Sequence, residues 1–371
     1  MGLSHWLARA AVAGPHLLVV EAPGAWGVRV AVEREAARRG WSMAHAPADA
    51  DVLAVCGDSL GEQDREAVEA VWEQMPGPRA RVHISHVGPP GVAAAFEQAA
   101  AQLLDGAAQR EEASLLEAWT RRDDARSADH GGMDHGGMDM AGPGGIALAT
   151  GGSDRDGLDM DVLHLPLGPV LSYWPPGLVV TLSLQGDVVT GAVVDRIPDW
   201  PSLQPAEASG SDAVPGAVTW GRAAAAWRCD AVVSVLSLAG AGRLAGLARA
   251  ARDQLWDPAI ADAIALASVG RLQRAARRAR VLRWSLRGLA PVEAAGRWEG
   301  DVHARLQRMI ETAVEETRTG RSERIDHTVA ADVYELLPSL LTGLELATVR
   351  LAVASVFGFH GAVAAPARGA A

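Results

Sequence analysis

Apolar runs and stretches with helical patterning alternate along the first hundred residues of the chain. Short apolar runs typical of buried strands occupy residues 16–20, 51–57 and 79–85. Helical patterning follows them at residues 28–39, 62–74 and 92–104. This order predicts an α/β domain with a doubly wound parallel sheet and right-handed crossovers. In such sheets functional groups gather at the carboxyl ends of the strands, which here are residues 21–28, 57–61 and 85–90.

The pattern changes twice in the rest of the chain. Residues 121–160 are rich in Asp, Gly, His and Met, which predicts a flexible linker. Strand-like runs then occupy residues 161–167, 177–184 and 188–194, with a turn at 185–187. Apolar residues recur at helical spacing from about 217 to 357. We therefore expect an α/β domain over 1–120 and an α+β domain over 161–371, with a short antiparallel sheet within 161–195 and helices over 217–357.

The composition is that of a folded protein that does not bind nucleic acid. Hydrophobic residues make up 49% of the 371 residues, and the formal net charge is -11. Phosphate backbones are held by net basic surfaces, so a general nucleic-acid binder is not expected. The densest basic run is Arg271 to Arg287. A solvated helix face is its first interpretation, and contact with an acidic partner or anionic lipid headgroups is the second.

Cysteine usage and hydropathy predict the compartment. The two cysteines, Cys56 and Cys229, give no disulfide framework and fit a reducing cytoplasm. The first residues lack the charged start and long apolar run of a signal peptide. Charged residues such as Arg243 interrupt the most apolar later stretches, which argues against a membrane-spanning helix. We expect a cytoplasmic protein, either free or held peripherally on the inner face of the membrane by a partner.

Two phrases in the first half carry a resemblance. A predicted strand ends at Cys56-Gly57, and a helix closes on residues 74–79, which read Gln-Met-Pro-Gly-Pro-Arg. Together they resemble the small cluster-bearing subunit of respiratory complex I and the small subunit of nickel–iron hydrogenases. In that family, the turn after the first strand and a Gly-Ser-Cys turn after a later strand supply cysteine ligands to an iron–sulfur cluster.

Other side chains occupy the matching positions in this chain. These degenerate ligand positions are Ala25 and Val28 in the first turn and Ser85, His86 and Val87 in the later one. A four-iron cluster needs about four cysteine ligands, whereas this chain has two distant cysteines. The resemblance therefore implies the fold and partners of that subunit, and we expect no iron–sulfur cluster.

The second half carries a further set of phrases. Residues 165–169, 175–178 and 184–189, and a later Gly-Asp phrase at 300–309, resemble the quinone-site subunit of complex I, which is related to hydrogenase large subunits. The family's histidine-bearing turn is replaced by residues 172–176, and its His-Arg-Gly phrase becomes Pro-Asp-Trp at 198–200. Cys-x-x-Cys pairs that bind nickel are absent. The groups that would polarise a quinone or hold a metal are therefore missing.

Tryptophans beside prolines follow the predicted strands of this second domain. Trp174 and Trp200 could cover a small-molecule cleft together with Tyr173, or could contact a protein partner. Packing in the core is an equal alternative. The sequence does not distinguish between a small-molecule cleft, a partner contact and core packing.

Histidines supply the remaining candidate chemistry. The linker holds a candidate copper site, because imidazole and thioether groups suit copper; its members are His130, Met133, His135, Met138 and Met140. A solvated spacer with no bound metal is the competing interpretation. His83 and His86 flank the third strand end, but two histidines without a partner at a recognised spacing are typical of an ordinary loop.

These observations predict a fusion of two subunits that pack together in the parent complexes. The leading hypothesis is a redox-inactive accessory, assembly or regulatory protein that binds complex I-like or hydrogenase-like subunits. No cofactor is expected. One alternative is an enzyme related to NADH-quinone oxidoreductase that keeps a quinone or other small-molecule site. Another is copper binding through the linker.

Overall fold

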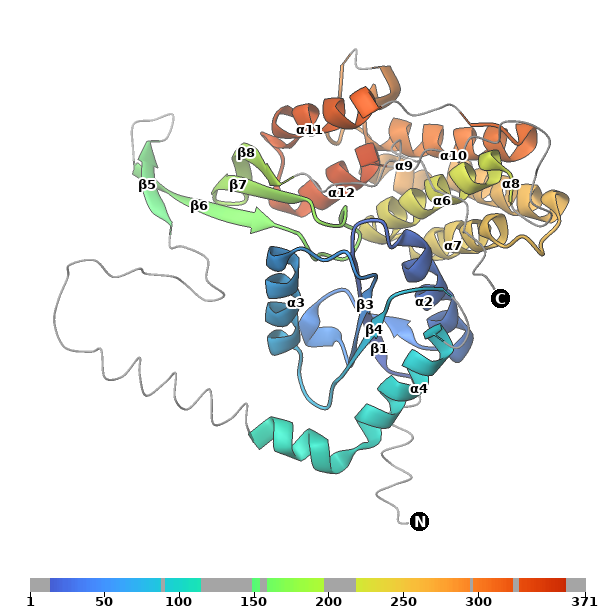
Figure 1. Cartoon of the computed structure of the whole chain (residues 1–371). Helices are drawn as coiled ribbons and strands as arrows, with labels where there is room; N and C mark the ends of the chain where they lie inside the picture. Colours follow the sequence, from blue (N-terminus) through green and yellow to red (C-terminus); the bar gives the residue numbers. More distant parts are fainter. Residues whose placement is uncertain are drawn as a thin grey trace. The chain divides into compact units, whose positions relative to one another are not determined.

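A computed structural model of the chain describes residues 14–87, 91–114, 149–153, 159–196, 218–293, 296–322 and 327–357. The chain divides into two compact units (Figure 1). The first comprises Met1–Leu148 with Val170–Ser172, and the second comprises Ala149–Pro169 with Tyr173–Ala371.

A parallel sheet forms the centre of the first unit. Its strands are β1 (His16–Glu21), β2 (Ser42–Met43), β3 (Val52–Cys56) and β4 (Ala80–Ile84), in the spatial order β2-β1-β3-β4. The helices between and after them are α2 (Trp26–Arg39), α3 (Glu62–Gln74) and α4 (Gly91–Leu104), and a 3-10 turn, η1, spans Pro47–Asp49. The predicted α/β class is thus confirmed. The two-residue strand β2 was not predicted, because a run this short has no period.

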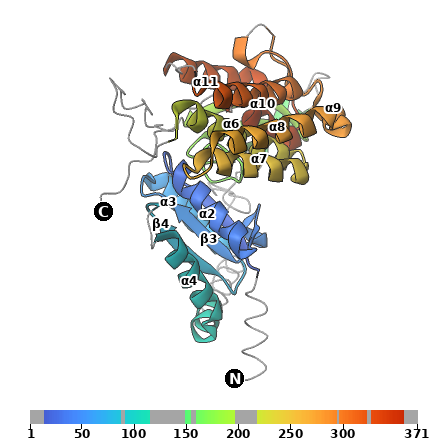
Figure 2. The same cartoon turned by 90° about the vertical axis from the view of Figure 1, so that its right-hand side faces the viewer.

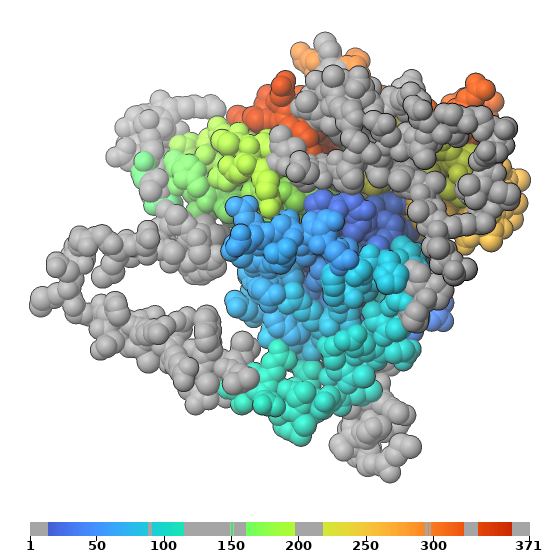
Figure 3. Space-filling model, in the orientation of Figure 1, coloured from blue at the N-terminus to red at the C-terminus, as the bar shows by residue number. Residues whose placement is uncertain are grey.

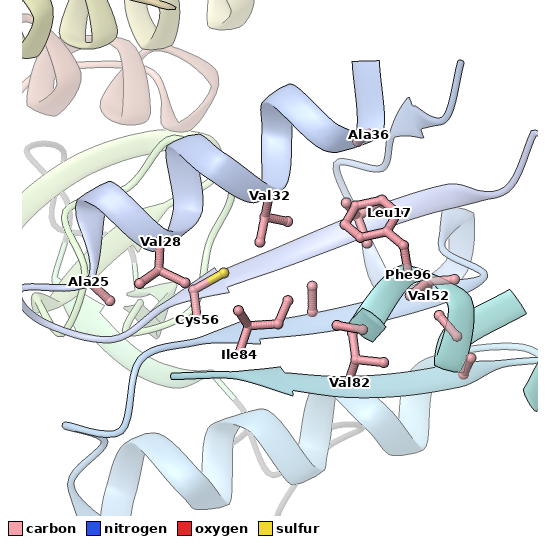
Figure 4. Close-up of a cluster of buried hydrophobic side chains, with 14 of the residues drawn as sticks. Leu17, Ala25, Val28, Val32, Ala36, Val52, Cys56, Val82, Ile84 and Phe96 are labelled. Atoms are coloured by element: carbon pink, nitrogen blue, oxygen red, sulfur yellow. The ribbon is translucent and has the colours of Figure 1, made fainter. Parts of the chain in front are cut away.

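The alternation of side chains along β3 divides the core of this unit into two layers. Val52, Ala54 and Cys56 pack on one face with α2 and α4, while Leu53 and Val55 pack on the other face with α3 (Figures 2 and 4). All five residues of β3 are buried. A strand covered on both faces is apolar at every position, which explains why its sequence shows no alternation.

The Gln-Met-Pro-Gly-Pro-Arg phrase at residues 74–79 ties parts of the first unit together through Arg79. The Arg79 guanidinium lies 4.1 Å from the Trp72 ring centroid and donates to Glu112 at 2.9 Å. Its Nη1 atom also donates to the carbonyl oxygens of Trp72 and Met75. Glu112 belongs to a helical stretch over residues 106–114 that lies along the outside of the unit (Figure 3). Arg79 therefore joins this outer helix to the end of α3.

The second unit begins with an antiparallel sheet. Its strands are β5 (Thr150–Ser153), β6 (Asp159–Leu167), β7 (Val179–Gln185) and β8 (Val188–Arg196), in that spatial order. The predicted turn between β7 and β8 is present, and Gly186 has a φ of 62° there. Strand β5 lies within the range expected to be linker. Its sequence, Thr-Gly-Gly-Ser, has no apolar residue that could have predicted a strand.

A helical region follows the sheet, as predicted. Its helices are α6 (Trp220–Leu238), α7 (Gly242–Trp256), α8 (Asp262–Arg278), α9 (Arg280–Leu286), α10 (Val302–Thr319), α11 (His327–Leu341) and α12 (Leu346–Phe357), with a 3-10 turn, η3, at Gly296–Trp298. Helix α6 is buried along most of its length and contacts α7, α10 and α12. Gly221 allows this packing, because a Cβ there would lie 2.4 Å from the Glu316 carbonyl oxygen. Among the described helices, none is long and apolar enough to cross a membrane.

Candidate functional site

The carboxyl ends of three parallel strands meet at one edge of the first sheet. The chain passes from β1 through α2 to β2 on one side and then crosses to β3 on the other, so the topology reverses between β1 and β3. The Ala22 amide donates to the Cys56 carbonyl oxygen, and the Gly57 amide donates to that of Ile84, both at 2.8 Å. The turns that hold the degenerate ligand positions therefore follow neighbouring strand ends. A reversal point of this kind is where open α/β sheets bind ligands.

Apolar packing fills this reversal point. Ala25 and Val28 are buried, and they belong to the same hydrophobic cluster as Cys56 and Ile84 (Figure 4). Gly57 has a φ of 90°, and a Cβ on it would lie 2.5 Å from the Ala25 Cβ. Methyl and isopropyl groups cannot bind iron. Ala25 and Val28 are therefore core positions in this chain.

The later turn presents its side chains differently. Ser85, His86 and Val87 are exposed, whereas Ala25 and Val28 are buried. The backbone turns meet at one edge, but the five side chains divide between solvent and the core. They do not form a single cluster that could surround a metal.

Cys56 lies at the centre of this edge, but its thiol is unsuited to ligation or redox chemistry. It is fully buried, and burial raises the pKa of the Cys56 thiol, with the Glu21 carboxylate raising it further. Metal binding and nucleophilic attack require the thiolate. The structure therefore favours a structural role for this cysteine.

A carboxylate–guanidinium network that the sequence did not single out lies beside the same edge. Arg29 of α2 donates through Nε to Glu21 at the end of β1 and through Nη1 to Glu33 at 2.6 Å. All three side chains are less than one-fifth exposed. The i,i+4 spacing of Arg29 and Glu33 was the available signal, but such pairs are common on exposed helices. The network attaches the first turns of α2 to β1.

His83 makes a second polar contact near the strand ends. Its Nε2 atom lies 2.9 Å from the Gly57 carbonyl oxygen and 3.1 Å from an Asp58 carboxylate oxygen. Both neighbours are acceptors, so Nε2 carries the proton. His83 and Asp58 are both more than half exposed. The expectation of a loop was wrong for His83, which lies in β4 and pairs with Val55 of β3.

In the second unit, Trp174 closes a tight turn. Its indole Nε1 donates to the Leu178 carbonyl oxygen at 2.9 Å, and the side chain is buried. Gly168 has a φ of 101°, and a Cβ there would lie 1.9 Å from the same oxygen. Tyr173 is half-buried and close enough to Arg350 to interact electrostatically. Trp174 thus has a packing role, and Trp200 lies outside the described residues.

The Gly-Asp phrase of the resemblance marks the start of α10. Gly300 has a φ of 89°, and the Asp301 carboxylate accepts from the amides of Ala304 and Gly288, each at 2.8 Å. Burial opposes ionisation of Asp301, but these backbone amides lower its pKa. Asp301 is therefore the N-cap that ties the helix to the loop before it.

Arg305, in the first turn of α10, holds the loop that precedes this helix through hydrogen bonds. It is fully buried and donates to the carbonyl oxygens of Ala290, Trp298 and Gly300 and to the Ser355 hydroxyl. These partners are all neutral, so burial lowers the pKa of Arg305 to about 10.

Further buried arginines neutralise charges within the helical region. Arg228 donates to Glu316 at 2.7 Å, and Arg252 donates to Asp230 at 2.8 Å. Cys229 lies between Arg228 and Asp230 in the chain, is fully buried, and has its thiol pKa raised by burial. Arg228 and Arg252 are thus paired with carboxylates, and the Cys229 thiol keeps its proton. Spacing did not reveal these pairs, because their partners lie on different helices.

Arginine also caps a helix end in this unit. Arg222 donates to the carbonyl oxygens of Gln254, Leu255 and Asp257 at the end of α7. Helix termini leave such carbonyl groups unpaired, so this contact gives Arg222 a structural role.

The candidate copper residues His130, Met133, His135, Met138 and Met140 lie outside the described residues. Within the part of the chain that is described, no three His, Cys, Asp or Glu side chains are grouped so that they could hold a metal ion. Comparisons of the chain with protein-family models, curated proteins and solved structures find no match.

Proposed function

We propose that this protein is a redox-inactive accessory, assembly or regulatory protein whose partners are complex I-like or hydrogenase-like subunits. The observation that carries the proposal is the apolar filling between β1 and β3. Ala25 and Val28 occupy the family's ligand positions, and both are packed against the buried Cys56. A scaffold that has lost its ligands can keep its partner-binding surfaces while losing the electron path.

The helical unit supports the same proposal. Its Gly-Asp phrase has a complete structural explanation in the Asp301 cap and the Arg305 anchor. The buried charges of Arg228 and Glu316 pair with each other. A non-catalytic relative would be expected to keep sequence phrases such as this one, because they are needed for folding.

A small-molecule site has less support. It was expected at Tyr173, Trp174 and Trp200, but the Trp174 indole N–H is engaged by Leu178 within its own turn. A quinone would need a polar group aimed at its carbonyl oxygen, and Trp174 does not supply one. We therefore place the accessory role first.

Gene deletion and complementation test this proposal. Deleting the gene is expected to lower the amount of assembled NADH-quinone oxidoreductase or hydrogenase in the host, measured by native gels and activity in membranes. Wild-type protein and the variant Cys56→Ser should restore assembly equally, because no thiolate chemistry is involved. Cys229→Ser is the matched control for loss of a buried thiol.

Metal analysis can reveal whether the protein instead carries an iron–sulfur cluster. Protein purified without oxygen and without a histidine tag should hold no stoichiometric iron and acid-labile sulfide. Stoichiometric iron and sulfide, lost in Cys56→Ser, would contradict the proposal. A double variant, His130→Ala with His135→Ala, identifies any copper held by the linker instead.

A further inference from the structure

Helix α9 carries two large hydrophobic side chains that face solvent. Val281 is 79% exposed and Trp284 is 82% exposed, whereas Leu282 and Leu286 on the other side of the helix are buried. In Figure 2 this helix lies at the edge of the helical unit. Among the described residues, Trp284 is the only Phe, Tyr or Trp whose side chain is largely exposed. Exposing it costs free energy unless another surface covers it.

Arginines flank this apolar pair along the chain. Exposed arginines on α8, on α9 and just after α9 are Arg271, Arg274, Arg277, Arg278, Arg280, Arg283 and Arg287. Arg277 forms an ion pair with Glu311 at 2.8 Å. Within the part of the chain that the structure describes, none of the other six forms an ion pair. We name residues 271–287 the basic end of the helical unit.

Phosphate-rich surfaces match this charge. The protein as a whole has a net charge of -11, so an anionic surface repels most of the molecule and attracts the basic end. The difference in charge between the basic end and the rest of the protein means that an anionic surface approaches the helical unit from the basic end. The attraction is largest at low ionic strength, where charges act over longer distances.

The apolar pair distinguishes between possible anionic surfaces. Tryptophan is favoured at membrane interfaces, because its ring enters the headgroup region while its N–H stays hydrated. Basic residues beside it interact with anionic headgroups. Val281 has no group that could bind a phosphate or stack on a base, but it gains by leaving water. We propose that the basic end binds directly to the surface of bilayers that contain anionic phospholipids, with Val281 and Trp284 entering the headgroup region.

Vesicle flotation with the full chain tests this proposal. The protein is mixed at low salt with vesicles of phosphatidylcholine alone, or with a quarter of the lipid replaced by phosphatidylglycerol. Binding is expected only to the anionic vesicles and should disappear in about 1 M salt, where the screening length falls to about 3 Å. Equal binding to both vesicle types, or no binding to the anionic ones, overturns the proposal.

Variants locate the contact. The triple variant Arg280→Glu, Arg283→Glu, Arg287→Glu should bind anionic vesicles at least about 100-fold more weakly, since each basic residue near such a surface contributes about fivefold. Trp284→Ser should weaken binding several-fold without changing the net charge. The matched controls are Arg65→Glu on α3 and Val193→Ser on β8, two exposed positions outside the basic end. Wild-type affinity in either test variant overturns the proposal.

Nucleic acid is the competing polyanion. If duplex DNA binds as tightly as the anionic vesicles and Trp284→Ser leaves vesicle binding unchanged, the basic end is a general polyanion surface and the lipid proposal fails. All substituted side chains are exposed, so far-UV circular dichroism should match the wild-type spectrum and exclude misfolding as the cause of lost binding.

Discussion

Gly57 and Ala25 lie against each other where the ends of β3 and β1 meet, with no room for a Cβ on the glycine. A Cβ at Gly57 would lie 2.5 Å from the Ala25 Cβ and 3.2 Å from the Ala22 Cβ. Three small residues thus close the edge of the sheet at the place where open α/β sheets bind ligands. The close contact makes the edge sensitive to an added methyl group.

Gly57→Ala should destabilise the first unit by about 2–4 kcal/mol. The new methyl group overpacks the site, and Gly57 also has a φ of 90°, which strains any residue with a Cβ. Urea unfolding followed by circular dichroism measures the change. Gly40→Ala is the control, because Gly40 has a φ of 75° but nothing within 4 Å of an added Cβ. A loss of about 1–2 kcal/mol is expected there from the left-handed backbone alone, and equal losses in the two variants would contradict the packing explanation.

Both cysteines should be inert in the native protein. Cys56 and Cys229 are fully buried, and burial raises the thiol pKa of each, so the reactive thiolate is scarce at neutral pH. Ellman's reagent should titrate essentially no thiol in native protein and both thiols in denaturant. Rapid reaction of one native thiol, assigned with Cys56→Ser and Cys229→Ser, would show that its site opens to solvent.

Much of the fold could be predicted from the sequence, because strands buried on both faces and amphipathic helices leave strong periodic patterns. Helix α3 begins and ends where the pattern of residues 62–74 placed it. The strands β2 and β5 could not be predicted, since two residues or a Thr-Gly-Gly-Ser run have no period. These two strands form because they pair with β1 and β6. A local sequence pattern does not encode such pairing.

At the carboxyl-end edge of the parallel sheet, the sequence predicted which backbone turns come together but not which of their side chains are buried. Strand order brings the three turns together, and this follows from the alternation of strands and helices. Which side chains turn inward depends on packing, and so the burial of Val28 and the exposure of His86 could not be read from spacing. Contacts over long separations are also invisible to local patterns: Arg228 and Glu316 are 88 positions apart.

Acid should weaken the first unit partly through Glu35. The hydrogen bond from Arg38 lowers the pKa of Glu35 to about 2, with burial opposing the shift and Arg39 adding to it. A carboxyl group whose folded pKa is depressed stabilises the fold above its unfolded pKa of 4.5 and loses that contribution as the pH falls toward 2. Glu35→Gln should therefore be less stable than wild type at pH 7, and the difference should shrink between about pH 4.5 and pH 2. Urea unfolding across this range measures it, and a difference independent of pH would contradict the assignment.

The buried pair between α6 and α10 offers the sharpest test of the helical unit. Arg228 and Glu316 are both less than one-tenth exposed and lie 2.7 Å apart. Removing one charge leaves the other buried, so Arg228→Met and Glu316→Leu should each cost about 3–5 kcal/mol. Replacing both with apolar residues of similar size, Arg228→Met with Glu316→Leu, should recover most of that loss, because no buried charge remains.

The exposed pair between α8 and α10 is the matched control for this cycle. Arg277 and Glu311 lie 2.8 Å apart, but both are about half exposed. Solvent screens such pairs, so Arg277→Met and Glu311→Gln should each change the free energy of unfolding by less than about 1 kcal/mol. Thermal and urea unfolding of the two sets of variants compares them directly. If the buried and exposed pairs behaved alike, burial could not be the reason that the Arg228–Glu316 pair stabilises the junction of α6 and α10.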